Sequence, residues 1–94
     1  MKFTVEIGNK EKHQISYSFN KFWGNVNISV DGKTIERDLR TYSLELTKSY
    51  QFSVGEKERH DIIIEKIRPL IHAGFRSNTY RIFVDGRLLK EFKD

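Results

Sequence analysis

Three histidines are the residues best suited to bind a metal ion or to move a proton near neutral pH: His13, His60 and His72. A zinc or iron site needs three or four converging ligands, and no pair of these histidines has the spacing that places two imidazoles on one face of a strand or helix. His13 is in phase with Ile15, which predicts a partly buried strand histidine. His72, in an irregular basic segment, is a candidate for anion binding or pH sensing. The sequence predicts no metal site and no cofactor.

The chain shows no arrangement typical of a catalytic nucleophile. It has no cysteine, and its serines do not lie in a Gly-x-Ser-x-Gly elbow. The six glycines are isolated and do not form a phosphate-binding loop. Two carboxylate pairs, Glu36 with Asp38 and Glu56 with Glu58, are interpreted as solvent-facing acids. These patterns predict a protein that is not an enzyme, with no catalytic residues.

The excess of positive charge lies in one segment. The chain has 17 basic and 13 acidic residues, which gives a net charge of +4. Residues 66 to 84 contain four lysines and arginines and no acid, so they account for this excess. We expect a partner-binding surface there, formed by Arg68, His72, Arg76 and Arg81; the alternative is an ordinary solvated loop with basic strand ends.

Two aromatic residues suggest other ligands. Trp23 and Phe83 have the opposite parity from the core-facing positions of their strands, so with Arg76 and Arg81 they could stack the bases of a single-stranded nucleic acid. This requires the two outward faces to adjoin; otherwise a loop covers the rings, or the parity is shifted by one. A third hypothesis is a carbohydrate or small ligand stacked on Trp23 or Tyr42, with Asn25 and Asn27 as polar contacts.

The elements that must position these residues are β-hairpins. Asn27–Ile35 and Arg81–Leu89 have the same pattern, an alternating strand, an Asp-Gly turn, a basic residue and a second strand. Asp-Gly is favoured in two-residue hairpin loops because the turn requires positive φ. The two copies are either related halves of the chain or independent uses of a common turn.

Apolar and polar residues alternate along most of the chain, which is typical of half-buried strands. The pattern predicts strands near residues 3–7, 13–19, 26–30, 35–39, 44–54 with a bend at 48–49, 62–67, 80–84 and 88–92. Seven to eight short strands without an amphipathic helix predict an all-β protein, a single antiparallel β-sandwich, with a small β-barrel as the alternative. The predicted core is Phe3, Val5, Ile15, Tyr17, Val26, Ile28, Val30, Leu44, Leu46, Phe52, Val54, Ile62, Ile64, Ile82, Val84 and Leu89.

Length and composition set the remaining expectations. The 94 residues suffice for one domain, residues 1–94, that folds without disulfides. No segment approaches the roughly 20 apolar residues of a membrane span. Residues 1–7 alternate, unlike the continuous apolar stretch of a signal peptide. We therefore expect a cytoplasmic protein that does not bind membranes.

The second half of the chain resembles the domain of the Fas apoptotic inhibitory molecule (FAIM) family. The resemblance is carried by Gln51–Gly55, the isoleucine strand Asp61–Ile64 and the hairpin Tyr80–Arg87, with Val30–Lys33 as an earlier hairpin. It covers residues 26–92. Tryptophans expected near the family's first strand and after its first hairpin are absent, and Arg40-Thr41-Tyr42 occupies the second of these places.

The resemblance implies a compact, non-catalytic β-sandwich that acts through protein contacts or protects protein stability. It implies no metal, cofactor or catalytic residue, and the apoptotic role is not carried over because fold transfers better than function. The leading hypothesis is a non-enzymatic interaction module with a protein partner. Nucleic-acid binding is the first alternative, and carbohydrate or small-ligand binding is the second.

Overall fold

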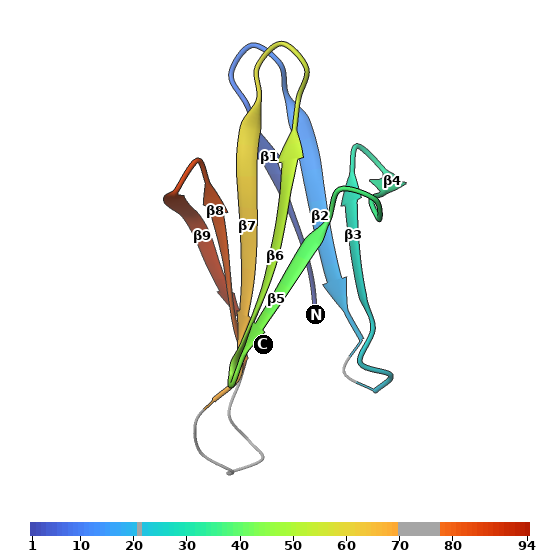
Figure 1. The fold of residues 1–94 in the computed structure, drawn as a ribbon, viewed down its shortest axis with the longest axis vertical. Helices are drawn as coiled ribbons and strands as arrows, with labels where there is room; N and C mark the ends of the chain where they lie inside the picture. Colours follow the sequence, from blue (N-terminus) through green and yellow to red (C-terminus); the bar gives the residue numbers. More distant parts are fainter. Residues whose placement is uncertain (21, 70–77) are drawn as a thin grey trace.

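The computed structural model consists of two antiparallel sheets that face each other (Figure 1). It describes residues 1–20, 22–69 and 78–94. The four-stranded sheet has the order β1 (Lys2–Ile7), β2 (His13–Phe19), β3 (Val26–Val30), β4 (Lys33–Thr34). The five-stranded sheet has the order β5 (Arg40–Leu44), β6 (Thr47–Val54), β7 (His60–Ile67), β8 (Thr79–Val84), β9 (Arg87–Lys93). The predicted all-β sandwich is confirmed, and the sheets do not close into a barrel.

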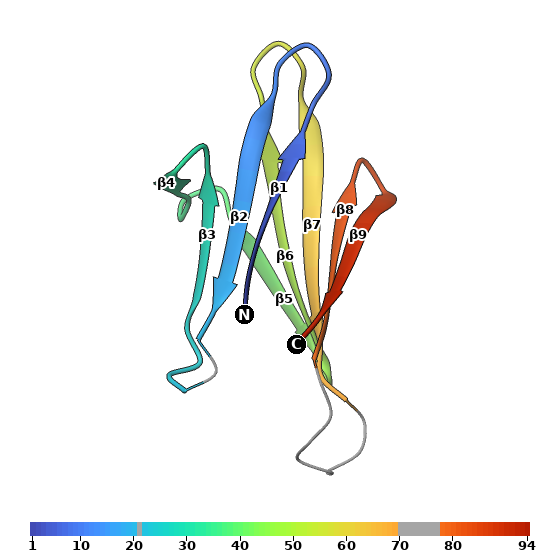
Figure 2. The ribbon, with the colours of Figure 1, turned by 180° about the vertical axis from the view of Figure 1, so that it is seen from behind.

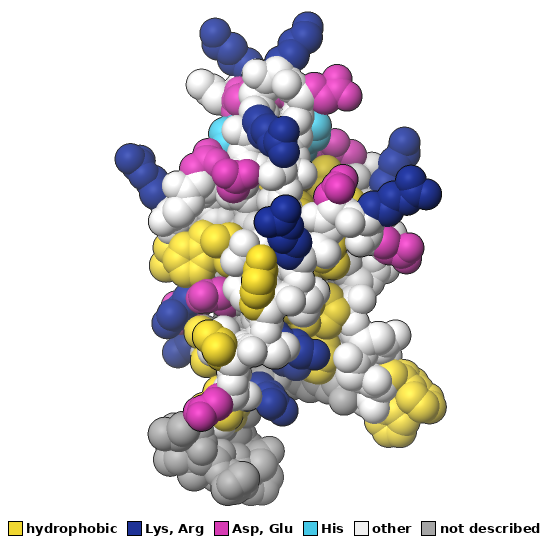
Figure 3. Space-filling view, viewed as in Figure 1, with side chains coloured by type: hydrophobic (Ala, Val, Ile, Leu, Met, Phe, Trp, Pro, Cys, Tyr) yellow, Lys and Arg dark blue, Asp and Glu magenta, His cyan; other side chains and the backbone are white. Residues whose placement is uncertain are grey.

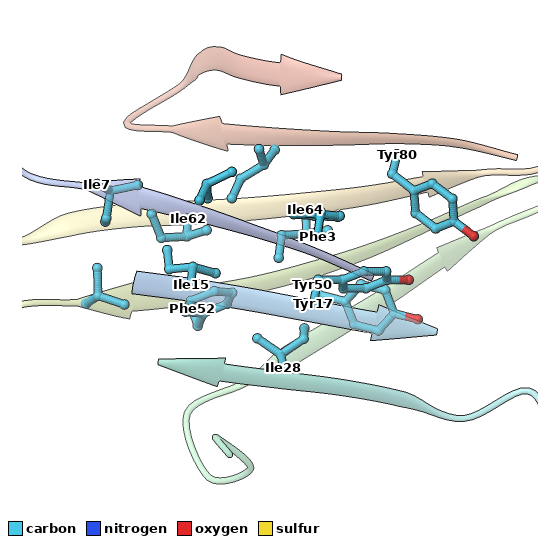
Figure 4. Close-up of a cluster of buried hydrophobic side chains, with 13 residues drawn as sticks. Phe3, Ile7, Ile15, Tyr17, Ile28, Tyr50, Phe52, Ile62, Ile64 and Tyr80 are labelled. Atoms are coloured by element: carbon cyan, nitrogen blue, oxygen red, sulfur yellow. The ribbon is translucent and has the colours of Figure 1, made fainter. Parts of the chain in front are cut away.

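The core lies between the sheets because alternate residues of each strand point inward. Strand β1, for example, alternates between exposed and buried positions over its whole length. The side chains drawn in Figure 4 come from both sheets and meet in one layer. The fully or almost fully buried apolar residues are Phe3, Val5, Ile7, Ile15, Tyr17, Ile28, Tyr50, Phe52, Val54, Ile62, Ile64, Tyr80 and Ile82.

The two sheets contain the same hairpin arrangement twice. β1, β2, β3 and β4 correspond to β6, β7, β8 and β9, since each set forms an antiparallel meander in the same order. The registers agree as well, because Ile28 pairs with Tyr17 as Ile82 pairs with Ile64. Figure 2 shows the β1–β2 and β6–β7 loops side by side at one end of the molecule. Strand β5 is the addition that makes one sheet larger.

The two Asp-Gly turns occupy equivalent places in this repeat and confirm the predicted hairpins. Asp31 and Asp85 have φ of 52° and 51°, and the glycines that follow have φ of 82° and 81°. Positive φ at both central positions is the conformation that selects Asp-Gly. The two copies therefore correspond structurally, which the sequence pattern left open.

Some local predictions were wrong. Residues 35–39 do not form a strand. Leu44 is 77% exposed and Leu89 is 47% exposed, so neither belongs to the core. A two-residue turn pairs Leu44 with Thr47, which reverses the parity expected across this segment. A register shift at Ile82/Phe83 in the β8–β9 pair similarly interrupts the alternation of β9.

The same alternation explains what the predicted core omitted. Tyr50 and Tyr80 lie at inward positions of β6 and β8 and are buried. Ile7, at the end of β1, is buried as well. Val26, Val30 and Val84 pack against the core from partly buried positions, as predicted. Among the described residues, none forms a helix that could cross a membrane.

Candidate functional site

The predicted binding residues are placed on different parts of the molecule. Arg81 and Phe83 lie on the outer face of β8, and Nε of Arg81 donates to Oε2 of Glu91 at 3.0 Å. Arg68 follows β7, and its Nη2 donates to the carbonyl oxygen of Glu45 at 3.4 Å. His72 and Arg76 lie outside the described residues. The structure thus brings Arg81 and Phe83 onto one face, with Arg68 beyond the end of the neighbouring strand.

Trp23 does not join this group. It is 76% exposed in the β2–β3 loop and contacts Phe22 edge-on, with ring centroids 5.1 Å apart. Figure 1 shows this loop and β8 on opposite sides of the molecule. The aromatic and basic patch expected to stack bases is therefore not assembled from Trp23 and Phe83. Tyr42 lies on β5 of the five-stranded sheet, whereas Trp23 and Asn25 lie in the β2–β3 loop and Asn27 lies on β3 of the other sheet.

The outer face of the five-stranded sheet carries an apolar patch, Ile63, Phe83 and Leu88. These residues are direct neighbours, since Ile63 pairs with Phe83 and Phe83 with Leu88. Leu88 is 52% exposed. Tyr42 and Leu44 add exposed apolar surface on β5 of the same sheet. Figure 3 shows hydrophobic side chains distributed over this face, among lysines and arginines.

The equivalent row in the four-stranded sheet is polar. Ser16 pairs with Ser29, and Ser29 pairs with Thr34, at the positions that correspond to Ile63, Phe83 and Leu88. Ser16 is in turn paired with Thr4, and the two hydroxyls lie 3.0 Å apart. The same hairpin thus folds with serines and a threonine in this row. The apolar residues of the five-stranded sheet are therefore not a requirement of the fold at these positions.

A second group of polar side chains surrounds the two described histidines, His13 and His60, which are the first residues of β2 and β7 after the β1–β2 and β6–β7 loops. Nδ1 of His13 is 2.6 Å from Oδ2 of Asp31, and its Nε2 is 2.5 Å from Oε2 of Glu11. His60 repeats this arrangement, with Nδ1 2.6 Å from Asp85 and Nε2 2.6 Å from Glu58. We call each group a histidine cluster.

The electrostatics of the clusters favour charged histidines. Hydrogen bonds to Asp31 and then Glu11 raise the pKa of His13, and those to Asp85 and then Glu58 raise the pKa of His60. An imidazole that donates from both ring nitrogens is an imidazolium ion. Both ring nitrogens of each histidine therefore lie within hydrogen-bond distance of a carboxylate.

The glutamates of the clusters also connect the two sheets. The carboxylate of Glu58 accepts hydrogen bonds from the backbone N–H groups of Asn9, Lys10 and Glu11 at 2.6–3.2 Å. The carboxylate of Glu11 accepts from those of Glu56 and Lys57, both at 2.9 Å. Each loop therefore supplies the carboxylate that satisfies the backbone of the other.

These bonds explain the acidity of the two glutamates. The histidine hydrogen bond is the largest cause and the backbone donors come next, and together they lower the pKa of Glu11 and of Glu58 to about 2. The carboxylates of Asp31 and Asp85 also have lowered pKa values. For Asp31 the first cause is the backbone N–H of Gln14, and for Asp85 it is His60. All four carboxylates are thus ionised at neutral pH.

The described residues contain no group of three histidine, cysteine or acidic side chains arranged to hold a metal ion. The hydrogen bonds of Glu11 and Glu58 give the histidine clusters a connecting role between the two loops. His13 is partly buried in a strand, as predicted.

A comparison with protein-family models decides the relationship of this chain. The model for Fas apoptotic inhibitory molecule (FAIM1) matches residues 1–94. The chain belongs to the FAIM1 family. The resemblance seen over residues 26–92 is thereby confirmed and extends over the whole sequence. Searches of curated proteins and of solved structures found no significant match.

Sequence reasoning missed the histidine clusters in this FAIM1-family chain, although a signal was present. Gly8–His13 reads Gly-Asn-Lys-Glu-Lys-His, and Gly55–His60 reads Gly-Glu-Lys-Glu-Arg-His. Each copy has the same distance from glycine to glutamate to histidine. Together with the two Asp-Gly turns, this second repeat places Glu, His and Asp in equivalent positions of both halves. Glu58 was interpreted as a solvent-facing acid, but its carboxylate accepts hydrogen bonds from the backbone of the β1–β2 loop.

Proposed function

We propose that this FAIM1-family protein is a non-enzymatic interaction module that binds a protein partner through the outer face of its five-stranded sheet. The observation that supports this is the difference between the two outer faces. Ile63, Phe83 and Leu88 occupy the positions that carry Ser16, Ser29 and Thr34 in the other sheet.

Exposed apolar residues lower the solubility of a protein unless a partner covers them. The serines and threonine of the four-stranded sheet show that the same hairpin folds without apolar residues at these positions. Aromatic residues and arginine are enriched at protein interfaces, and this face carries Phe83, Tyr42 and Arg81. Arg81 is held in place by Glu91, so it presents an ordered guanidinium beside the apolar patch. Arg68, after β7, extends the cationic surface of the partner-binding residues expected from the sequence.

The non-enzymatic part of the proposal is supported by the histidine clusters. A general base needs a free ring nitrogen within reach of a substrate. Both nitrogens of His13 and His60 are engaged by carboxylates.

Site-specific photo-crosslinking tests the proposed surface. A photoreactive phenylalanine analogue at position 88 should give protein adducts of defined mass when the protein is expressed in its own cells. The matched control is the same analogue at position 34, the equivalent exposed position of the other sheet. Adding Phe83→Ser should abolish the adduct at position 88. Equal adducts at both positions, or adducts insensitive to Phe83→Ser, would contradict the proposal.

A further inference from the structure

The two halves of the repeat differ in the strand that closes each sheet. β9 extends over Arg87–Lys93, whereas its counterpart β4 extends only over Lys33–Thr34. In Figure 1, β9 accompanies β8 along most of its length, while β4 lies beside one end of β3. The rest of that edge of β3 is without a neighbouring strand in the part of the chain that the structure describes.

The strand register identifies which residues of the first half correspond to the part of β8 that β9 covers and β4 does not. In the five-stranded sheet, Lys90–Lys93 pairs with Thr79–Ile82. The equivalent residues of the first half are Asn25–Ile28. Ile35 still donates its N–H to the carbonyl oxygen of Ile28 at 2.9 Å, and the chain then passes to β5 in the other sheet. Residues 25–28 therefore form what we call the short-paired edge of β3.

The backbone groups of Val26 point to this edge, whereas the carbonyl of Ile28 already accepts from Ile35. The carbonyl of Ile28 faces the β4 side, and alternate residues of an antiparallel strand point their N–H and C=O groups to the same side. The backbone N–H and C=O groups of Val26 therefore point toward the short-paired edge. The hydrogen bonding of Phe19, which pairs with Val26 in β2, agrees with this orientation. The N–H of Phe19 points away from β3 and donates to the carbonyl oxygen of Met1.

A pocket with apolar and polar lining residues adjoins this edge. It has a volume of about 380 Å³, and residues of both sheets line it. Val26, Ile28, Leu39 and Tyr50 belong to its apolar lining, and Asn27, Thr34, Glu36 and Thr41 to its polar lining. Val26 and Leu39 are only partly buried. An added strand would place every second side chain into this pocket, because strand side chains alternate between faces.

The other half shows what such a strand carries. The residue equivalent to Tyr50 is Phe3, and its ring is stacked on that of Phe92 with centroids 4.3 Å apart. Phe92 belongs to the part of β9 that has no counterpart in β4. The second half thus contains the strand and the aromatic side chain for which the first half has only an edge and a pocket.

We propose that the short-paired edge of β3 binds an extended segment of a protein partner, which adds to the sheet as an antiparallel strand and places an aromatic side chain in the pocket. Main-chain hydrogen bonds give such strand addition its affinity, and the pocket gives it selectivity. This site is separate from the outer face of the five-stranded sheet.

A peptide with the sequence of residues 87–94 is the probe, because this sequence already forms the equivalent strand in the other half. Titrated into the protein of residues 1–94, it should change the fluorescence of Trp23, the only tryptophan of this sequence, which lies three residues before Val26. Amide NMR shifts should change at residues 25–28, 39 and 50. A peptide with alanine in place of its phenylalanine should bind roughly tenfold more weakly or worse, as expected for an aromatic anchor.

Two variants of the protein locate the site. Val26→Pro removes the N–H that points to the free edge, a position where proline is tolerated in strands, and should abolish binding. Val26→Thr keeps the N–H and the branched shape and is its control. Leu39→Lys places a charge at the pocket without changing β3 and should also weaken binding.

The outcomes are distinguishable from those of the crosslinking experiment on the outer face. Saturable shifts at residues 25–28 that are lost in Val26→Pro support strand addition. Shifts confined to residues 79–84 would show exchange with the protein's own β9 and would overturn the proposal. The absence of saturable shifts, or equal binding by Val26→Pro and Val26→Thr, would overturn it as well. None of these results depends on whether position 88 contacts a partner.

Discussion

Each described histidine lies between two carboxylates, and this placement changes what the residue can do. His13 connects the loop glutamate, Glu11, with the turn aspartate, Asp31. Asp31 in turn accepts the N–H of Gln14 at 2.8 Å, so the Asp-Gly turn is fastened to the neighbouring strand. The histidine cluster is therefore a structural cross-link between a loop, a strand and a turn.

The histidine clusters predict a stability maximum in mildly acidic solution. A raised pKa in His13 and His60 stabilises the folded state fully below their ordinary pKa of 6.5, and this contribution is lost as pH rises through the folded-state values. The pKa of Glu11 and of Glu58 is lowered from an ordinary 4.5 to about 2. These two glutamates therefore stabilise the folded state fully above pH 4.5, and this stabilisation is lost as pH falls toward 2.

We therefore expect the free energy of unfolding, measured with urea across pH, to be highest between pH 4.5 and 6.5 and to fall on both sides. Replacing both histidines with glutamine should remove the decline above pH 6.5. An alkaline decline of unchanged size in that variant would show that other groups cause it.

Two glycines with positive φ, Gly55 in the β6–β7 loop and Gly86 in the β8–β9 turn, predict different losses of stability on substitution by alanine. Gly55 has φ of 97°, and a Cβ there would collide with the backbone oxygen of Glu58. Gly86 also has positive φ, 81°, but its Cβ would enter open space. Gly86→Ala should lower the free energy of unfolding by about 1 kcal/mol or somewhat more, from backbone strain alone. Gly55→Ala should cost clearly more, and similar urea midpoints for the two variants would contradict the loop geometry.

Among the elements, the strands could be predicted best where alternation is uninterrupted and turns are marked by glycine. β1, β2, β3, β7 and β8 follow the expected segments to within a few residues. The turn at Glu45–Leu46, which separates β5 from β6, could not be predicted from the sequence because it contains neither glycine nor proline. Residues 35–39 alternate like a strand, but they form the passage from one sheet to the other.

Equivalent core positions of the two sheets predict equivalent losses of stability. Ile28 and Ile82 are 2% and 0% exposed, and each lies in the strand before an Asp-Gly turn. Ile28→Ala and Ile82→Ala should each lower the free energy of unfolding by about 2–5 kcal/mol. Leu44→Ala is the control and should change it by no more than about 0.5 kcal/mol, because Leu44 is exposed. A large loss in Leu44→Ala would contradict the turn at Glu45–Leu46.

For the whole molecule, the sandwich could be predicted from strand count and alternation, but the candidate sites could not. Arg81 and Phe83 were placed on an outward face correctly. The distance between Trp23 and this face depends on which sheet each strand joins, and alternation carries no information about that. Each histidine cluster forms within one half of the chain, but the hydrogen bonds that join the two clusters run between loops 47 residues apart, which only the packing of the sheets brings together.

The exchanged carboxylates predict an effect that crosses from one sheet to the other. Glu58→Ala should speed amide hydrogen exchange at Asn9, Lys10 and Glu11 more than at Glu56 and Lys57, since Glu58 accepts from the first three. Glu11→Ala should show the converse pattern. Faster exchange limited to the substituted loop would contradict the reciprocal contacts. Glu56→Gln, in the same loop, is the matched control.

The reciprocal contacts of the loops have the form of an isologous interface, in which residue i contacts j and residue j contacts i. Glu11 binds the second loop and Glu58 binds the first, as two identical subunits would do around a twofold axis. The chain is thus organised as a homodimer fused into one polypeptide. Fusion frees the two subunits from remaining identical, because one sequence no longer has to serve both places. That freedom allows Ser16 and Ile63 to occupy equivalent positions of the two sheets, one polar and the other apolar.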